Sequence, residues 1–310
     1  MTISTGKLTI PLNKGLEKSV AMNQAEDVHW RSLLFVPADN ARYLEKARTS
    51  RADAIVLDLE DAVLTEHKAE ARSAVQGMAR SVRTGSRDVL VRINRPLSLA
   101  VRDIEAAVCG HVKAIVVAKS AGAGHLALLS EVLDELEAAS GLSRGHTKLL
   151  PLIETAEAVA RLEEIASSPR VIAIACGDED LAAVLGCDPN SETVIAVKYR
   201  LVVAAALRGI RPLGLLGTIA EFRDIEKYRS FVRRSHDAGL KGTLCIHPSQ
   251  VDVANEGFAP DDEQLEYARR VVEAAEVARK SGAAAVALDG KMIDTPVLRR
   301  AENVLKAVQL

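Results

Sequence analysis

Two carboxylates follow two short apolar segments in the middle of the chain. Glu154 comes directly after Leu149–Ile153, and Asp180 follows Val171–Cys176 within the sequence Gly-Asp-Glu-Asp. Short continuous apolar segments bounded by turn residues are typical of buried parallel strands, whose carboxyl ends meet at one edge of a sheet. Carboxylates on two neighbouring strands can hold a hard cation such as Mg²⁺ and leave several of its coordination positions open to a substrate. We therefore expect Glu154 and Asp180 to form a magnesium site.

Each of these carboxylates also has a purely structural explanation. Glu154 could be a solvated residue at a helix start, and Asp180 could be a first-turn carboxylate stabilised by the helix dipole. The backbone N–H groups of Gly177, Asp178 and Glu179 open a predicted helix, and such an N-terminus suits a substrate carboxylate beside the metal. We favour the metal site because further polar residues follow other predicted strands.

These further residues are Glu60, Asp61, Arg92, Lys119 and His247. One polar residue after a strand is often only a turn residue or a helix cap, but several at the same end of a sheet indicate a site. Arg92 remains charged and can stabilise negative charge that develops on an oxygen. Its structural alternative is an ion pair with Glu60 or Asp61.

Lys119, His247 and the segment Ser120–His125 each allow two interpretations. Lys119 could act as a Schiff-base nucleophile if desolvated, but the nearby carboxylates favour an ion-paired lysine. His247 precedes Pro248, and we expect a structural role at a strand end rather than catalysis. The segment Ser120–His125 resembles a phosphate-binding loop only weakly, and we expect an ordinary loop.

The elements that must position these residues alternate as strand and helix from Arg31 onward. Candidate strands are Leu33–Val36, Ala54–Leu59, Val89–Ile93, Ala114–Ala118, Leu149–Ile153, Val171–Cys176, Ile210–Leu215 and Gly242–Ile246. Candidate helices between them are Asn40–Thr49, Glu66–Arg80, Ala100–Val108, Leu126–Ala139, Ala156–Ala166, Val194–Leu207 and Ile219–Ala238. This alternation predicts a (β/α)8 barrel, and we prefer it to a doubly wound open sheet because polar residues follow nearly every strand.

The pattern divides the chain into three parts. We expect a flexible arm over residues 1–29, the barrel over residues 30–255 and a C-terminal lid of helices over residues 256–310. In the lid, Asp261–Lys280 and Thr295–Gln309 are predicted helices, separated by the apolar run Ala283–Leu288 and a turn at Asp289-Gly290-Lys291. A barrel is complete without this lid, so the lid either caps the barrel or packs on a neighbouring subunit.

Composition limits the classes of function. The chain of 310 residues is 48% hydrophobic, which is ample for a large core, but only 3% aromatic. Few aromatic residues and a net charge of −2 argue against binding to nucleic acid or to anionic membranes. No apolar run is long enough to span a membrane. Four cysteines without a CxxC pair, and no apolar leader, predict a reduced cytoplasmic protein.

Seven motifs occur in one order along the chain. They are Arg31–Ala38 (RSLLFVPA), Asp58–Val63 (DLEDAV), Arg92–Asn94 (RIN), Ile153–Ala156 (IETA), Gly177–Leu181 (GDEDL), His247–Gln250 (HPSQ) and Asp289–Asp294 (DGKMID). Each is weak alone, but seven in sequence are specific. From about Arg31 to its end, the chain resembles the citrate lyase β-subunit-like proteins of the HpcH/HpaI-type aldolase superfamily, which include malyl-CoA and citramalyl-CoA lyases.

The resemblance implies a (β/α)8 barrel that binds Mg²⁺ and cleaves a 3-hydroxyacyl-CoA to acetyl-CoA and a 2-oxo acid. It implies that Glu154 and Asp180 hold the metal and that Arg92 binds the thioester or enolate oxygen. Glu60 and Asp61 would lie behind the metal or orient its water. Related hydroxy-acid aldolases carry a histidine where this chain has Asp61, so the catalytic base of those enzymes is not assigned to this position.

The same resemblance assigns the CoA contacts and the lid. Phe35, Arg42 and Lys46 match the CoA-contact region, with the two cations placed for phosphates. Asp294 matches an acid/base carboxylate on a lid that closes over a neighbouring subunit, which implies a homo-oligomer, a trimer or hexamer. Asp294 also precedes Thr295-Pro296 and could simply be a helix N-cap, and one residue can do both.

One departure from the family concerns the segment Arg211–Thr218 at strand seven. It is small and apolar where many relatives carry an acidic residue. A less polar opening of the barrel favours a substrate with an extra methyl group. We therefore expect citramalyl-CoA, which yields pyruvate, to be preferred over malyl-CoA, which yields glyoxylate.

Three alternative functions remain. They are a metal-free Schiff-base aldolase using Lys119, a β subunit acting only in a citrate lyase complex with an acyl carrier protein, and a malyl-CoA thioesterase or malate synthase-like enzyme.

Overall fold

The computed structural model describes residues 28–280 and 285–307, so residues 1–27 of the predicted arm lie outside it. All eight predicted strands are present, and each end lies within two residues of its predicted position. The strands are β1 (Ser32–Pro37), β2 (Ala54–Asp58), β3 (Asp88–Ile93), β4 (Ala114–Val117), β5 (Lys148–Ile153), β6 (Ala173–Cys176), β7 (Arg211–Leu213) and β8 (Thr243–Cys245). Apolar β-branched and leucine residues dominate them, as buried parallel strands require.

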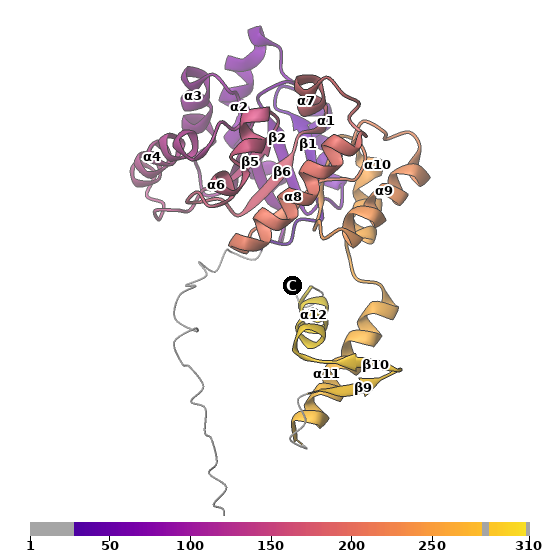
Figure 1. Cartoon of the computed structure of the whole chain (residues 1–310). Coiled ribbons are helices and arrows are strands. Elements are labelled where there is room, and N and C mark those ends of the chain that lie inside the picture. The colour runs from indigo at the N-terminus through magenta and orange to yellow at the C-terminus, as the bar shows by residue number, and fades with distance from the viewer. Residues whose placement is uncertain (1–27, 281–284, 308–310) are drawn as a thin grey trace, which may run out of the picture.

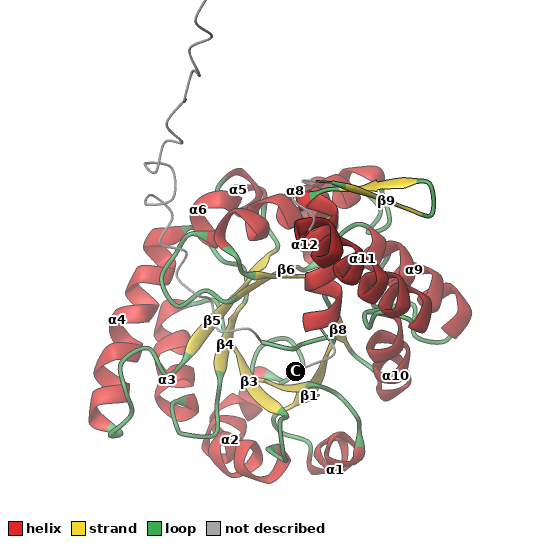
Figure 2. Cartoon of the chain, turned by 90° about the horizontal axis from the view of Figure 1, so that it is seen from below, coloured by secondary structure: helices red, strands yellow, loops and turns green. Residues whose placement is uncertain are grey.

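The eight strands form a nearly closed parallel barrel. Neighbouring strands pair in the order β7-β6-β5-β4-β3-β2-β1-β8. The gap between β7 and β8 is bridged by two backbone hydrogen bonds of 2.9 Å, from Lys241 N to the Pro212 carbonyl and from Gly214 N to the Gly242 carbonyl. Figure 2 shows the strands around the central axis with helices outside them. The predicted (β/α)8 barrel is confirmed.

Helices connect the strands and cover the outside of the barrel (Figure 1). They are α1 (Ala41–Thr49), the short 3-10 helix η2 (Thr65–His67), α2 (Lys68–Val82), α3 (Leu97–Ala107), α4 (Ala123–Ala139), α5 (Ala156–Ala160), α6 (Leu162–Ala166), α7 (Asp178–Leu185), α8 (Glu192–Arg208), α9 (Ile225–Asp237) and α10 (Pro248–Gly257). Two predicted helices differ. The helix predicted from Ile219 begins at Ile225, because Asp224 caps its first turn. The helix predicted over Ala156–Ala166 is broken at Arg161.

The core has two layers, separated by the strands themselves. In β2, Ala54 and Val56 belong to the cluster inside the barrel, whereas Ile55 and Leu57 pack toward the helices. This alternation follows from the two-residue period of a strand. Close approach of strands requires Gly242, where a Cβ would lie 1.9 Å from the Trp30 carbonyl oxygen. Small and branched residues therefore fill this core with few aromatic rings.

A C-terminal extension follows α10. It consists of α11 (Asp262–Lys280), β9 (Val286–Leu288), β10 (Lys291–Ile293) and α12 (Thr295–Lys306). The predicted turn is a hairpin turn, in which Asp289 and Gly290 adopt positive φ angles of 50° and 73°. The apolar run predicted from Ala283 contributes β9, although residues 281–284 lie outside the described range.

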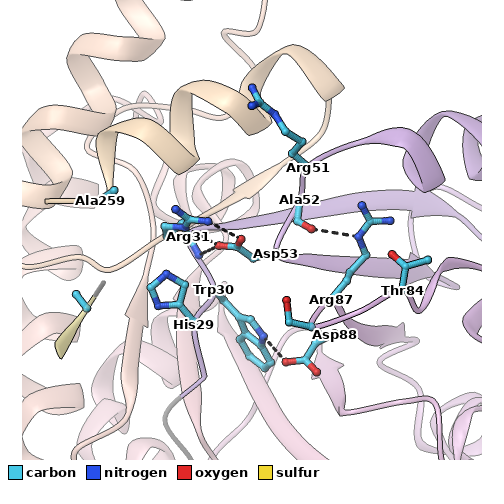
Figure 3. Close-up of a pocket in the computed structure, with 12 residues that line it drawn as sticks. His29, Trp30, Arg31, Arg51, Ala52, Asp53, Thr84, Arg87, Asp88 and Ala259 are labelled. Carbon is cyan, nitrogen blue, oxygen red and sulfur yellow. Dashed lines mark hydrogen bonds and ion pairs between the residues drawn. The ribbon is translucent and has the colours of Figure 1, made fainter. Parts of the chain in front are cut away.

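The extension lies beyond the amino-terminal ends of the barrel strands (Figures 1 and 2). Ala307, directly after α12, lines a cavity of about 500 Å³ together with Trp30, Asp53 and Asp88 from the starts of β1, β2 and β3. Figure 3 shows that polar groups of this cavity pair with one another, including Arg31 with Asp53 and Trp30 with Asp88. These contacts join the starts of β1, β2 and β3.

Within the described residues, no helix is both long enough and apolar enough to cross a lipid bilayer.

Candidate active site

A cavity of about 420 Å³ opens at the carboxyl ends of the strands. Its charged lining residues are Asp58, Asp61, Arg92, Glu154, Asp178, Glu179 and Asp180. Its apolar lining includes Phe35, Leu152, Gly214, Leu215, Ile219, Leu244 and Ile246. Active sites of (β/α)8 barrels lie at this end, because loops from all eight strands converge there.

Of the two carboxylates that are expected to bind the metal, Glu154 is the more deeply buried. It ends β5 with an exposed fraction of 3%, and its Oε2 accepts a 2.5 Å hydrogen bond from the backbone N–H of Lys119. A Cβ on Gly177 would lie 2.4 Å from Glu154 Cγ, so only glycine leaves room for this side chain. Burial, together with the charges of Asp180 and Glu60, raises the pKa of Glu154 to about 7, although the hydrogen bond from Lys119 N–H and the charge of Arg92 lower it.

Asp180 stands at the rim of the same cavity, in the first turn of α7. Its side chain is 42% exposed, and its Oδ1 lies 3.8 Å from the ammonium of Lys119. Asp180 and Glu154 come from adjacent strand ends, because β5 pairs directly with β6. The two carboxylates that the sequence analysis assigned to a metal therefore face one cavity.

Arg92, near the end of β3, lines the same cavity and is held by acidic side chains. It makes a two-point contact with Asp58 at 2.7 and 2.5 Å and an ion pair with Glu60 at 2.9 Å. Burial lowers the pKa of Arg92, but Asp58 and then Glu60 outweigh it and raise the pKa above its ordinary value. Its guanidinium lies 5.0 Å from the ring centre of Phe35. The ion pair expected as its structural alternative exists, and Asp58 is a partner that the sequence analysis missed.

Lys119 is an ion-paired lysine. Its ammonium lies 2.6 Å from Glu60, 3.7 Å from Asp61 and 3.8 Å from Asp180. Burial lowers its pKa, but the bond to Glu60 outweighs this and the pKa is raised. Lys119 has a positive φ of 48°, an uncommon conformation for a residue other than glycine, and this turns its N–H toward Glu154.

Sequence reasoning missed Lys198, a fully buried lysine in α8. Its ammonium donates to Asp178 Oδ2 at 2.9 Å and to the backbone carbonyls of Leu215 and Gly217. The signal was present in the sequence, because Lys198 lies on the apolar face of its helix, four residues after Val194 and three before Leu201. A lysine on such a face needs a buried partner.

The remaining predicted site residues lie at the edges of the site or away from it. Glu179 accepts a hydrogen bond from Thr218. Arg42 and Lys46 are exposed on α1, outside the residues that line the cavity. His247 caps α10 and stacks on Phe222, in agreement with the expected structural role. Asp294 accepts from the backbone N–H of Val297 at 3.2 Å and so is the N-cap of α12 in the extension.

The sequence profile of the HpcH/HpaI aldolase/citrate lyase family matches residues 31–248 of this chain. The chain belongs to this family. The resemblance inferred from the seven motifs is thereby confirmed, and it places the chain among carbon–carbon lyases.

Curated relatives in the HpcH/HpaI family align over most of the chain. The citrate lyase β subunit of Escherichia coli K12 is 32% identical over 94% of this chain and 97% of its own. A (3S)-malyl-CoA thioesterase of Cereibacter sphaeroides is 31% identical over 86% and 90%. An L-malyl-CoA/β-methylmalyl-CoA lyase of Rhodobacter capsulatus is 30% identical over 90% and 95%.

Among solved structures, the Mycobacterium tuberculosis protein CitE has 29% identity and a TM-score of 0.71, and the match covers 90% of this chain and 98% of CitE. That crystal structure contains magnesium, acetoacetate and coenzyme A.

The cavity residues of this chain suit a divalent cation. Glu154 and Asp180 supply carboxylate oxygens, and the raised pKa of Glu154 reflects a buried negative charge that a cation would compensate. Within residues 28–280 and 285–307, no cluster of three or more His, Cys, Asp or Glu side chains forms a metal site by itself. Two protein carboxylates with several positions left for water and substrate are typical of Mg²⁺ rather than of structural zinc.

Proposed function

We propose that this chain is a Mg²⁺-dependent carbon–carbon lyase that cleaves a 3-hydroxyacyl-CoA to acetyl-CoA and a 2-oxo acid. The observation that carries the proposal is a single cavity of about 420 Å³ that is lined by Glu154, Asp180 and Arg92. Two carboxylates for a cation and a fixed guanidinium in the same cavity match the two oxygens on which charge develops in such a cleavage.

Each group in the cavity has a proposed role. Glu154 and Asp180 would hold Mg²⁺, which when bound favours ionisation of the substrate hydroxyl. The backbone N–H groups of Gly177, Asp178 and Glu179 at the start of α7 bind the substrate carboxylate. Arg92, kept charged by Asp58 and Glu60, stabilises the enolate oxygen of the departing thioester.

We propose citramalyl-CoA as the preferred substrate, with pyruvate as the second product. The apolar lining at Gly214, Leu215, Ile219 and Leu244 supports this choice, because it offers contacts to a methyl group that malyl-CoA lacks. Phe35 lines the same cavity, and Arg42 and Lys46 on the exposed face of α1 would bind CoA phosphates. Four free cysteines support the cytoplasm as the working compartment.

The proton chemistry is assigned to Asp294 of a second copy of the chain. Asp294 would protonate the enolate carbon, and in the condensing direction it would remove the proton. The extension that carries it lies beyond the amino-terminal ends of the strands, at the opposite end of the barrel from the cavity (Figure 1). This placement supports a homo-oligomer, a trimer or hexamer, in which each lid closes over a neighbouring cavity.

The test is an assay of the purified chain with and without Mg²⁺ on citramalyl-, malyl- and citryl-CoA. We expect acetyl-CoA and pyruvate from citramalyl-CoA, with loss of activity in EDTA. Free malate from malyl-CoA would instead indicate a thioesterase, and no activity without acyl carrier protein would indicate a citrate lyase subunit. Borohydride trapping in the presence of a 2-oxo acid would indicate Lys119 chemistry, which its 2.6 Å ion pair with Glu60 disfavours.

The trans arrangement is tested by complementation. Glu154→Ala and Asp294→Asn are each expected to be inactive, and asparagine is chosen because it preserves the N-cap of α12. Mixed oligomers of the two variants should regain activity, since some cavities then combine an intact Glu154 with an intact Asp294. Mixtures that stay inactive, alongside active wild-type oligomers treated identically, would contradict the shared site.

A further inference from the structure

Lys198 joins two segments of the cavity wall. Its side chain is fully buried, and an ammonium has three hydrogens to donate. One goes to Asp178, at the start of α7, and the other two go to the carbonyls of Leu215 and Gly217, in the segment after β7. All three donors are therefore used, and the end of β6 is tied to the end of β7.

The segment after β7 is packed tightly around these contacts. A Cβ on Gly217 would lie 2.3 Å from the ring of Phe231, so the backbone there fits closely under α9. The N–H of Leu216, the residue between the two carbonyls, donates to the Ser235 hydroxyl at 2.7 Å. Leu215 and Asp178 both line the cavity that contains Glu154, so a shift of this segment changes the cavity directly.

Asp178 has one oxygen committed to Lys198 and one that is not. The residue is 8% exposed, and its Oδ1 is buried without a hydrogen-bond partner among the described residues, although the weakly polar thiol of Cys176 interacts with the carboxylate. Buried carboxylate oxygens are rarely left in this state, because losing water without a replacement is costly. Asp178 also lines the cavity, which places this oxygen beside the space that a substrate would occupy.

We propose that Lys198 and Asp178 form a clamp that selects the acyl group of the substrate. This inference rests on the proposed function. Asp178 Oδ1 accepts a hydrogen bond from the bound acyl portion or its ordered water. Lys198 touches no substrate; it is a positioning residue that aims Asp178 and holds the apolar wall at Leu215 in place. The clamp thus sets the discrimination between thioesters that differ by one methyl group.

The experiment compares wild type, Lys198→Met and Lys198→Arg as full-length proteins with Mg²⁺. kcat and KM are measured on citramalyl-CoA and malyl-CoA. Methionine has a similar length but no charge. The measured quantity is kcat/KM for the thioester that wild type prefers, divided by kcat/KM for the other thioester. We expect Lys198→Met to lower this ratio about tenfold, so that it approaches one. Arginine keeps the charge and should recover part of the ratio.

Two controls separate selection from stability. Because an unpaired buried Asp178 can prevent folding, Asp178→Asn/Lys198→Met removes both charges together and should fold while still showing the reduced ratio. Glu137→Gln disrupts a different buried ion pair, with Arg170 at the other end of the barrel, and should lower the melting temperature without changing the ratio. The clamp would be overturned if Lys198→Met kept the wild-type ratio, or if Glu137→Gln changed the ratio as much as Lys198→Met does.

Failure of the proposed function gives a different result. If wild type cleaves neither thioester, binding of pyruvate and of glyoxylate in the presence of Mg²⁺ is measured by calorimetry instead. Lys198→Met should then reduce the difference in affinity between the two oxo acids. An unchanged difference would overturn the clamp independently of catalysis.

Discussion

Two groups of buried charges at opposite ends of the barrel differ in how completely they are paired. At the amino-terminal end, Glu137 of α4 lies 2.8 Å from Arg170 and also accepts from the backbone N–H groups of Gly145 and Thr147. At the carboxyl end, Glu154 accepts its hydrogen bond from the backbone of Lys119, and the charges that act on it are the carboxylates Asp180 and Glu60 and the guanidinium of Arg92.

The pKa values of the two glutamates record this difference. Burial raises the pKa of Glu137, but Arg170 and the two N–H groups outweigh it and hold the pKa below its ordinary value. Burial raises the pKa of Glu154 to about 7, because the hydrogen bond from Lys119 N–H and the charge of Arg92 do not outweigh it. A fully paired buried charge serves the fold, whereas an underpaired one at the mouth of a barrel is ready for a cationic ligand. The two ends should therefore respond differently to the same kind of substitution.

The largest expected effect is the loss of activity in Glu154→Gln. A bound cation contributes several kcal/mol to transition-state stabilisation, so kcat on the preferred thioester should fall about a thousandfold. The melting temperature of the metal-free protein should stay the same or rise, because a buried charge is removed. Asp39→Asn, at an exposed position in the turn between β1 and α1, is a matched control for the assay. A large drop in melting temperature with retained activity would assign Glu154 to the fold.

The second effect is a loss of stability in Glu137→Gln. Removing one partner leaves the Arg170 charge buried and undercompensated, which typically costs about 3 kcal/mol of the free energy of unfolding. Urea unfolding at pH 7 measures it, while kcat of the folded protein should be unchanged. If this variant instead lost activity at unchanged stability, the distinction between the two ends would be wrong.

The third effect is the pH dependence of that stability. The pKa of Glu137 is lower in the folded than in the unfolded protein, so its contribution is present above the unfolded pKa of about 4.3 and is lost as the pH falls through the folded value. Urea midpoints of wild type should therefore approach those of Glu137→Gln as the pH is lowered from 7 to 3. Parallel profiles would show that Glu137 does not titrate in this way.

The smallest effect is expected for Arg144→Ala. Arg144 pairs with Asp134, which also contacts Arg170, but its own side chain is 84% exposed. Solvent screens such a pair, so the urea midpoint should not move measurably. A destabilisation comparable to that of Glu137→Gln would show that the whole network, rather than its buried part, supports the fold.

Much of the fold could be predicted because its strands are local apolar runs. Leu149–Ile153 and Val171–Cys176 identify themselves through composition, and the polar residue that ends each one marks the mouth. The helix predicted from Ile219 began too early, since Asp224 competes for the N-cap. The position of the extension could not be predicted, because no local pattern specifies which end of a barrel a distant segment occupies.

The site was predicted in part for the same reason. Glu154, Asp180 and Arg92 stand at strand ends, where sequence position implies placement. Asp58 stands at a strand end too, but its pairing with Arg92 was missed, and Lys198 was missed because it lies within a helix. Both contribute through long-range partners, Arg92 and Asp178, which sequence order alone does not pair. The roles of the site residues and the domain boundaries remain predictions.

The single tryptophan has a practical consequence. Trp30 is 1% exposed, donates its indole N–H to Asp88 at 2.9 Å and lies at the amino-terminal end of the strands, as Figure 3 shows. Its emission should therefore be blue-shifted in the native protein and shift to the red when the strand starts separate. Ligands that enter the distant mouth should leave this signal nearly unchanged. Intrinsic fluorescence is thus a clean optical reporter of unfolding, and binding needs a probe introduced elsewhere, such as a tryptophan in place of Phe222.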